Sequence, residues 1–224
     1  MTTFCVLYPD LLGTYGDGGN GLAVTQRAVR RGLDAELVTV GLNDEVPDAA
    51  LYLLGGGEDG PQRLAADLLR RSTFGSRVRD GAHVVAVCAG LQILGSTFCV
   101  EGDDEYEGLG LVDAVTSRGE RRSVGEFATR VDGQLLVGFE NHGGRTTLSG
   151  VDALGTVVKG RGNDGKLDGY RTKNIWATYA HGPVLAMNPW FTYVILSSVY
   201  GVELGPLTSV ADALYQERCR VVSV

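Results

Sequence analysis

The residue with the clearest potential for chemistry in this sequence is Cys88. It follows the apolar run Val84–Val87 directly, and the residues after it favour a helix. Ala86 and Gly90, two positions before and two after, are small enough for a sharp strand-to-helix turn. Such a turn lifts a nucleophile above a sheet, and the positive end of a helix favours the thiolate. The pattern therefore predicts a nucleophilic cysteine rather than a buried structural one.

A thiol nucleophile needs a base within hydrogen-bond reach, and the chain has three histidines. His83 lies five residues before Cys88 on the same expected strand. The two would be about 16 Å apart and on opposite faces of the sheet, which excludes His83. His181 and His142 each follow an apolar run, where an open α/β sheet places its functional residues. The residues alone leave these two histidines as competing candidates for the base.

An acyl intermediate on Cys88 would also need N–H donors for its oxyanion. Ala89, next to the cysteine, is one candidate. Gly56, in the glycine-rich segment after Leu51–Leu54, is the other, although such a segment can equally be an ordinary turn. A second glycine-rich segment, residues 16–20, lacks the sequence of a phosphate-binding loop, so we expect no nucleotide there.

The elements that must position these residues alternate between strand and helix in the first half of the chain. This alternation is typical of a parallel sheet covered by helices. Asn20 is the expected N-cap of the first helix, and Pro61 opens the second. The expected strands are 4–8, 35–40, 51–54 and 84–87, and the expected helices are 21–31, 61–73 and 91–98.

The second half of the chain has a different pattern, with short extended stretches separated by turn residues. It predicts antiparallel pairing at one side of the sheet, followed by two helices. No linker divides the chain, so we expect residues 1–224 to form one domain. The expected strands are 123–131, 134–139, 151–159 and 175–179. The expected helices start at Asn188-Pro189 and at a cap provided by Thr208 or Ser209.

The composition excludes several classes of function. The formal net charge is −7, so a nucleic-acid or anionic-membrane surface is not expected. No apolar run approaches the roughly 20 residues that span a bilayer, and the N-terminus lacks a basic signal region. The four cysteines show neither metal-ligand nor disulfide spacing, which favours a reducing, cytoplasmic compartment and no bound metal.

Several segments together resemble the class I, triad-type glutamine amidotransferases, within the cobyric-acid-synthase-like branch. The strand-to-helix turn at Cys88 is specific to that class. The run Phe139–Arg145 is similar to the GatD-type glutaminase subunits of bacterial lipid II isoglutaminyl synthase. The resemblance implies a flavodoxin-like α/β fold with a central, mainly parallel sheet flanked by helices. The matching segments are Tyr8–Leu12, Tyr15–Asn20, Leu54–Asp59, Val87–Gln92, Val137–Thr146 and Tyr179–Pro183.

The resemblance decides between the two histidines. The class places its base in the position of His181, so His142 becomes a structural or interface residue. The sequence departs from the class at Ala86, where glycine is common, and at Pro183, where the usual triad has a glutamate. No acid of this chain is therefore obviously placed to orient His181. We expect a Cys–His dyad whose third member is missing or comes from a partner chain, and weak activity for the chain alone.

The resemblance also implies that an arginine from the middle of the chain binds the substrate, L-glutamine. Arg122 is the favoured residue and Arg121 the less favoured one. A guanidinium fork suits the α-carboxylate of glutamine, because it offers two parallel donors. Gly55 and Gln92 are further expected contacts of the substrate.

The implied function is hydrolysis of L-glutamine to glutamate and ammonia through a Cys88 thioester. The ammonia would pass to a Mur-ligase-like, ATP-dependent synthetase subunit in a heterodimer. That subunit would amidate the D-glutamate of lipid II, a peptidoglycan precursor. ATP and Mg are expected on the partner, and no cofactor on this chain. The expected location is the cytoplasm, at the inner face of the membrane through the partner and its lipid-linked substrate.

Three other functions stay open at this point. A glutaminase for cobyric acid or another corrinoid usually shares a chain with its synthetase domain, for which 224 residues leave no room. A stand-alone cysteine amide hydrolase, such as a γ-glutamyl hydrolase, would work fully without a partner. A flavodoxin-like or regulatory binding module would leave Cys88 unreactive toward a glutamine-analogue electrophile.

Overall fold

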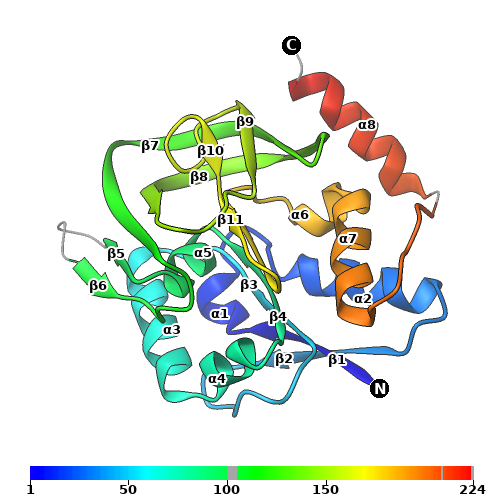
Figure 1. The fold of residues 1–224 in the computed structure, drawn as a ribbon, viewed down its shortest axis with the longest axis horizontal. Coiled ribbons are helices and arrows are strands. Elements are labelled where there is room, and N and C mark those ends of the chain that lie inside the picture. Colours follow the sequence, from blue (N-terminus) through cyan, green and yellow to red (C-terminus); the bar gives the residue numbers. More distant parts are fainter. Residues whose placement is uncertain (100–104, 208, 223–224) are drawn as a thin grey trace.

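The computed structural model of the protein describes residues 1–99, 105–207 and 209–222. Within these residues the strands form two six-stranded sheets, and most of the helices surround the first (Figure 1). The first sheet is parallel except for one edge strand, and the second is mainly antiparallel. This confirms the predicted α/β class, with a mainly parallel sheet and antiparallel strands in the second half.

The first sheet forms the core of the molecule. Its strands β3, β4 and β12 are buried at nearly every position, because helices cover the sheet. In Figure 1, α3 lies to the left of this sheet, and α2 and α7 lie to its right. The strand order is β11 (Tyr170–Arg171), β12 (Ile175–Thr178), β4 (His83–Val87), β3 (Leu51–Leu54), β1 (Thr2–Leu7) and β2 (Ala35–Val40).

Helices follow β1, β3 and β4, as is usual between parallel strands, whereas residues 41–50 join β2 to β3 without a helix. Among the described residues, no helix combines the length and the apolar character needed to cross a membrane. The helices are α1 (Pro9–Leu12), α2 (Gly19–Arg30), α3 (Asp59–Arg71), α4 (Phe74–Arg79), α5 (Ala89–Leu94), α6 (Val184–Met187), α7 (Pro189–Tyr200) and α8 (Val210–Val222).

The second sheet is built around one long hairpin, β7 (Ala114–Val131) and β8 (Gln134–Leu148). In its ladder, Arg118 pairs with Gly144 and Ser123 pairs with His142. Residues 119–122 therefore stand opposite Gly143 alone and bulge out of the ladder. The remaining strands are β5 (Thr97–Cys99), β6 (Glu105–Glu107), β9 (Gly155–Lys159) and β10 (Leu167–Asp168).

The two sheets meet at His181, which follows β12. Its backbone exchanges hydrogen bonds with that of Phe139 on β8, at 2.8 Å and 3.2 Å. Gly138 lets the strands come this close, because a Cβ there would lie 2.4 Å from the His181 carbonyl oxygen. The hairpin is thereby attached to the edge of the first sheet where its parallel strands end.

Several expected elements form where they were predicted. β2 and β3 have the predicted bounds. α7 begins at Pro189 with Asn188 as N-cap, and Gly201 follows it with a left-handed φ of 64°. α8 begins just after Ser209, whose Oγ donates to the Asp212 carboxylate. Thr208, the alternative cap, lies outside the described residues.

Three expectations are wrong. The expected strands 123–131, 134–139 and 151–159 belong to a separate sheet, as parts of β7, β8 and β9. The expected strand 175–179 joins the first sheet as β12, parallel to β4, and β11 pairs antiparallel to it at the edge. The expected helix 91–98 ends at Leu94, because residues 97–99 pair with β7 as β5. Asn20 is not an N-cap but lies inside α2, where its Oδ1 accepts the Leu185 N–H at 2.8 Å.

Candidate active site

Four loops bring the candidate residues together at one edge of the first sheet. They follow β1, β3, β4 and β12 and carry, respectively, Asp17, Gly55–Gly57, Cys88 and His181. Because these strands are parallel, their carboxyl ends lie at the same edge. Residues 164 positions apart in the sequence thus come into direct contact.

Cys88 occupies the sharp turn that its neighbours predict. It lies between β4 and α5 with φ 50° and ψ −104°, a strained conformation for a residue other than glycine. Gly90 allows the helix to start so close to β3, because a Cβ there would lie 2.7 Å from Leu54 Cβ. The Cys88 side chain is only 5% exposed, yet it lines a pocket. The thiol is therefore held at the end of the strand and reaches an opening.

His181 is fully buried and is oriented by a carboxylate. Its Nδ1 lies 2.8 Å from Asp17 Oδ2, and both side chains have no exposed surface. Its Nε2 makes no hydrogen bond within the described part of the chain. Burial alone would lower the pKa of His181, but Asp17 and the nearby Cys88 sulfur raise it to about 10. The ring is therefore an imidazolium at neutral pH, with one nitrogen left for proton transfer.

The expectation of a Cys–His dyad without an acid from this chain is wrong, because the Asp17 carboxylate contacts His181. Asp17 Oδ2 accepts a hydrogen bond from the Gly56 N–H at 2.9 Å and lies 2.8 Å from His181 Nδ1. These two donors fix the carboxylate. Pro183, where the class has its glutamate, lies against the same loop: a Cβ on Gly19 would be 2.5 Å from Pro183 Cγ. The glycine-rich segment that the sequence left without a role thus supplies the acid.

Gly56 does not have the predicted role. Its N–H already donates to Asp17, so it is not available to an oxyanion. Glycine is required there because a Cβ would lie 2.4 Å from His181 Cε1. Gly57, the next residue, lines the pocket with Cys88, and its N–H has no acceptor among the described residues. The Ala89 N–H, at the start of α5, likewise has none, so Ala89 stays a predicted oxyanion donor.

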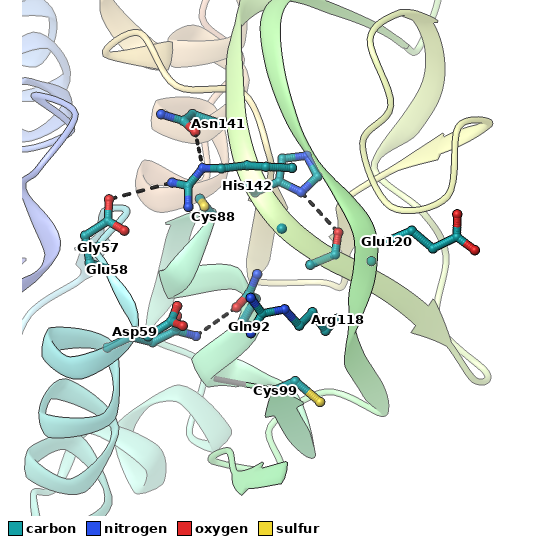
Figure 2. Close-up of a pocket in the computed structure, with 15 residues that line it drawn as sticks. Gly57, Glu58, Asp59, Cys88, Gln92, Cys99, Arg118, Glu120, Asn141 and His142 are labelled. Carbon is teal, nitrogen blue, oxygen red and sulfur yellow. Dashed lines mark hydrogen bonds and ion pairs between the residues drawn. The ribbon is translucent and has the colours of Figure 1, made fainter. Parts of the chain in front are cut away.

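The pocket in front of Cys88 has a volume of about 200 Å³ and lies between the first sheet and the β7–β8 hairpin (Figure 2). Its size and its mostly polar wall suit a small polar metabolite rather than a polymer. The lining residues are Gly57, Glu58, Asp59, Gln62, Cys88, Gln92, Cys99, Arg118, Gly119, Glu120, Arg122, Asn141, His142, Gly143 and Gly144.

Arg122 comes from the bulge of β7 and reaches this pocket. Its Nε donates to Asn141 Oδ1 at 2.6 Å, and its Nη2 donates to the Tyr15 hydroxyl at 2.9 Å. Glu58 lies 3.7 Å from the same guanidinium and accepts the Tyr15 hydroxyl at 2.6 Å. The structure brings Arg122 and Cys88 to one pocket, and the predicted contact with a substrate carboxylate stays a prediction. Tyr15, Asn141 and Glu58 were not identified from the sequence.

Gln92 also lines the pocket, but its amide already has partners. Its Oε1 accepts Gln62 Nε2 at 2.9 Å, and its Nε2 donates to the Tyr179 hydroxyl at 3.2 Å. Gln62 is a further pocket residue that the sequence did not reveal. Gly55 is not part of the pocket lining: its carbonyl accepts the Gly90 N–H at 3.1 Å, and a Cβ there would lie 2.0 Å from Leu12 O. The predicted contact of Gly55 with the substrate stays a prediction.

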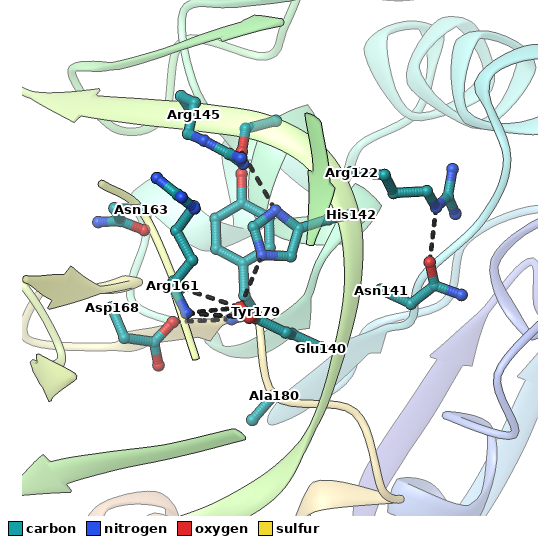
Figure 3. A network of polar contacts seen from close by, with 12 residues as sticks. Arg122, Glu140, Asn141, His142, Arg145, Arg161, Asn163, Asp168, Tyr179 and Ala180 are labelled. Atoms are coloured by element: carbon teal, nitrogen blue, oxygen red, sulfur yellow. Dashed lines mark hydrogen bonds and ion pairs between the residues drawn. The ribbon is translucent and has the colours of Figure 1, made fainter. Parts of the chain in front are cut away.

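His142 has the contacts of a structural residue, in line with the expectation. Its Nε2 lies 3.1 Å from Glu140 Oε2, and its Nδ1 lies 3.1 Å from the Gly144 carbonyl. Its ring is stacked on that of Tyr179, with 3.8 Å between centroids (Figure 3). Burial lowers the pKa of His142 despite the Glu140 carboxylate. Although it lines the pocket, both of its ring nitrogens are occupied.

Comparison with curated proteins gives relatives that cover most of the chain. The GatD subunit of the glutamine-hydrolysing lipid II isoglutaminyl synthase of Staphylococcus aureus is 34% identical over 84% of this chain and 79% of its own length. The subunit of the same name from Streptococcus pneumoniae is 32% identical over 94% of this chain and 86% of its own. A cobyric acid synthase of Sinorhizobium medicae is 31% identical over 77% of this chain but only 36% of its own length.

Solved structures show which fold the chain shares, and one family model shows its family. PurLQS from Thermotoga maritima superposes with a TM-score of 0.60 at 19% identity, over 89% of this chain and 98% of that one, which shows a shared fold. A structure described as a glutamine amidotransferase gives 0.59 at 20% identity, over 88% and 98%. The model of the CobB/CobQ-like glutamine amidotransferase domain matches residues 3–189. The chain therefore belongs to the family of CobB/CobQ-like glutamine amidotransferase domains.

Proposed function

We propose that this protein is the glutaminase subunit of a lipid II isoglutaminyl synthase. The observation that carries the proposal is the alignment of Cys88, His181 and Asp17 at one sheet edge, beside a small polar pocket. The two GatD relatives, which match the chain over most of their length, support the choice of this reaction within the family.

The first half of the reaction forms a thioester. The Cys88 thiolate attacks the carboxamide carbon of glutamine, and the N–H groups of Ala89 and Gly57 hold the resulting oxyanion. His181 is protonated at neutral pH, so its Nε2 gives its proton to the departing nitrogen. Ammonia leaves, and a γ-glutamyl thioester remains on Cys88.

The second half reverses the role of the histidine. His181 is now neutral and removes a proton from water through Nε2, and the water oxygen attacks the thioester carbonyl. Glutamate leaves, and the Cys88 thiolate and the imidazolium are restored. Asp17 stabilises the imidazolium whenever it forms and holds the neutral ring in the same orientation, since its Oδ2 stays against Nδ1.

The α-groups of glutamine would lie at the mouth of the pocket. Arg122 offers its guanidinium to the α-carboxylate, held in place by Asn141 and Tyr15. Glu58 provides a carboxylate for the α-ammonium group on the same side. This arrangement selects a free amino acid, because both α-groups must be charged.

The ammonia is consumed by a second subunit in this proposal. A Mur-ligase-like synthetase, with its own ATP and Mg, activates the α-carboxyl of the D-glutamate in lipid II and forms the amide. The complex acts in the cytoplasm, at the inner face of the membrane, where its lipid-linked acceptor is held.

The proposal is tested in the complex of the two subunits. Cys88→Ala and His181→Ala are each expected to abolish glutamate release and glutamine-dependent amidation of lipid II. Both variants should retain amidation from added ammonium chloride, because the synthetase site is intact. Cys219→Ala, a thiol on α8 outside the pocket lining, is the matched control. Glutamate release that survives in Cys88→Ala would contradict the proposal.

A corrinoid glutaminase is the second candidate, favoured by the matches to cobyric acid synthases. These matches span about a third of those proteins, however, whereas the GatD relatives match over most of their length. Mass analysis of the amidated acceptor, with lipid II and a corrinoid acid offered in parallel, separates the two candidates.

A further inference from the structure

A second hollow, of about 340 Å³, adjoins the Cys88 pocket on the β7–β8 hairpin. The two share the wall formed by residues 118–120. Four guanidinium groups and one carboxylate line this arginine hollow, in a chain whose net charge is −7. Its lining residues are Arg118, Gly119, Glu120, Arg121, Arg145 and Arg161.

The bulge in β7 places two neighbouring arginines in two different hollows. Successive side chains of an extended chain point to opposite sides. Arg122 accordingly reaches the Cys88 pocket, whereas Arg121 reaches the arginine hollow. One feature of the backbone therefore joins the candidate active site to a cationic surface beside it.

The other arginines are held by the strand that carries His142. The Glu140 carboxylate accepts the backbone N–H of Arg161 at 2.9 Å and that of Gly162 at 3.0 Å, which fixes their loop. Arg145 donates to the Gly144 carbonyl at 2.6 Å and to the Arg121 carbonyl at 2.7 Å. Figure 3 shows Arg145 and Arg161 on one side of the His142 ring and Arg122 on the other.

This arrangement leaves like charges close together. Burial and the charge of Arg161 lower the pKa of Arg145. Arg121, Arg145 and Arg161 form no ion pair within the described part of the chain. Guanidinium groups hold carboxylates or phosphates in paired hydrogen bonds, so an anionic occupant would relieve the repulsion.

We propose that the arginine hollow is the surface on which the synthetase subunit docks, through acidic side chains. The proposal rests on the proposed function, because it takes its partner from that reaction. An occupant of the hollow would also contact residues 118–120, which line the Cys88 pocket as well. Ammonia released there would pass to the second active site without meeting bulk water, in which it would be protonated.

The test compares two double charge reversals in binding to the purified synthetase. Arg121→Glu/Arg161→Glu changes the hollow. Arg30→Glu/Arg79→Glu makes the same change in charge at exposed arginines on α2 and α4. The first is expected to raise the Kd about tenfold or more at low salt and to flatten its salt dependence. The control should stay within about twofold of wild type, and thermal unfolding checks that both variants fold.

The outcomes separate this proposal from the proposed function. Suppose that the wild-type complex forms and amidates lipid II, and that the Arg121→Glu/Arg161→Glu variant binds the synthetase as tightly as wild type does. This result overturns the docking surface and leaves the proposed reaction unaffected. A second result also overturns the docking surface: the isolated chain binds inorganic pyrophosphate tightly, and the variant abolishes this binding without changing the affinity for the synthetase. The hollow would then belong to a phosphate-bearing ligand. A wild-type chain that binds no synthetase overturns both proposals.

Discussion

Two buried pairs of a histidine and a carboxylate occur among the described residues, close to the same pocket but on different sheets. His181 and Asp17 lie at the edge of the parallel sheet, with 2.8 Å between Nδ1 and Oδ2. His142 and Glu140 lie on β8 of the second sheet, with 3.1 Å between Nε2 and Oε2. In both pairs the side chains are at most 5% exposed, so burial does not distinguish them.

What distinguishes the pairs is the second nitrogen of each ring. His142 uses it on the Gly144 carbonyl, and its ring is stacked on Tyr179. His181 leaves it without a partner among the described residues, beside the Cys88 sulfur. The pKa of His142 is lowered, whereas that of His181 is raised to about 10. A carboxylate next to a buried histidine therefore does not mark a catalytic pair unless the other nitrogen is open toward a reactive group.

The most direct test of the difference between the two pairs replaces each carboxylate with its amide. Asp17→Asn is expected to lower kcat for glutamine hydrolysis about 10³-fold or more, because His181 loses the charge that stabilises its imidazolium. Glu140→Gln should stay within about tenfold of wild type, since no step passes through His142. Initial rates of glutamate release by the complex measure both. If Asp17→Asn keeps nearly full activity, another acid orients His181.

The second pair should show its importance in stability rather than in rate. The Glu140 carboxylate accepts from His142 and from the backbone of Arg161 and Gly162. Glu140→Ala leaves these buried donors unpaired and should lower the free energy of unfolding by about 3–5 kcal/mol. Glu140→Gln retains an acceptor and should lower it by only about 1 kcal/mol. Urea denaturation compares the two, and equal losses would show that the carboxylate does not hold this network.

The sequence predicted the elements of the first sheet and the nucleophile because both depend on local patterns. An apolar run fixes the bounds of β3, whereas Leu, Val and Thr residues indicate β2, and small residues on both sides of Cys88 fix its turn. The role of Asp17 was not predicted, because its contact with His181 joins positions 164 residues apart. A signal was available nonetheless: its loop follows a strand of the parallel sheet, so it had to end at the same edge as Cys88.

The expectations for Gly55 and Gly56 rest on the same kind of signal. A glycine-rich loop at a sheet edge shows where the chain passes close to something, but not whether that neighbour is a substrate or another side chain. Gly56 makes room for His181, and Gly55 makes room for the Leu12 carbonyl. The bulge at residues 119–122 could not be predicted from the sequence either, because the register of the β7–β8 hairpin is set by pairing across the turn.

The last expected effect is a pH dependence of stability that His181 should cause. Its pKa is about 10 in the folded chain and near 6.5 in the unfolded one. Between these values the folded state holds a proton that the unfolded state does not. The stabilisation is therefore complete below about pH 6.5 and is lost as the pH rises toward 10, by about 1.4 kcal/mol for each pH unit.

Urea denaturation of wild type and His181→Gln between pH 6 and 9 measures this dependence, as the difference in unfolding free energy at each pH. The difference should shrink steadily as the pH rises. Asp17→Asn should flatten it, because the charge that raises the pKa of His181 is removed. His142→Gln should leave the slope unchanged, because the pKa of His142 is lowered rather than raised. A slope that Asp17→Asn leaves intact would mean that the Cys88 sulfur alone holds the proton on His181.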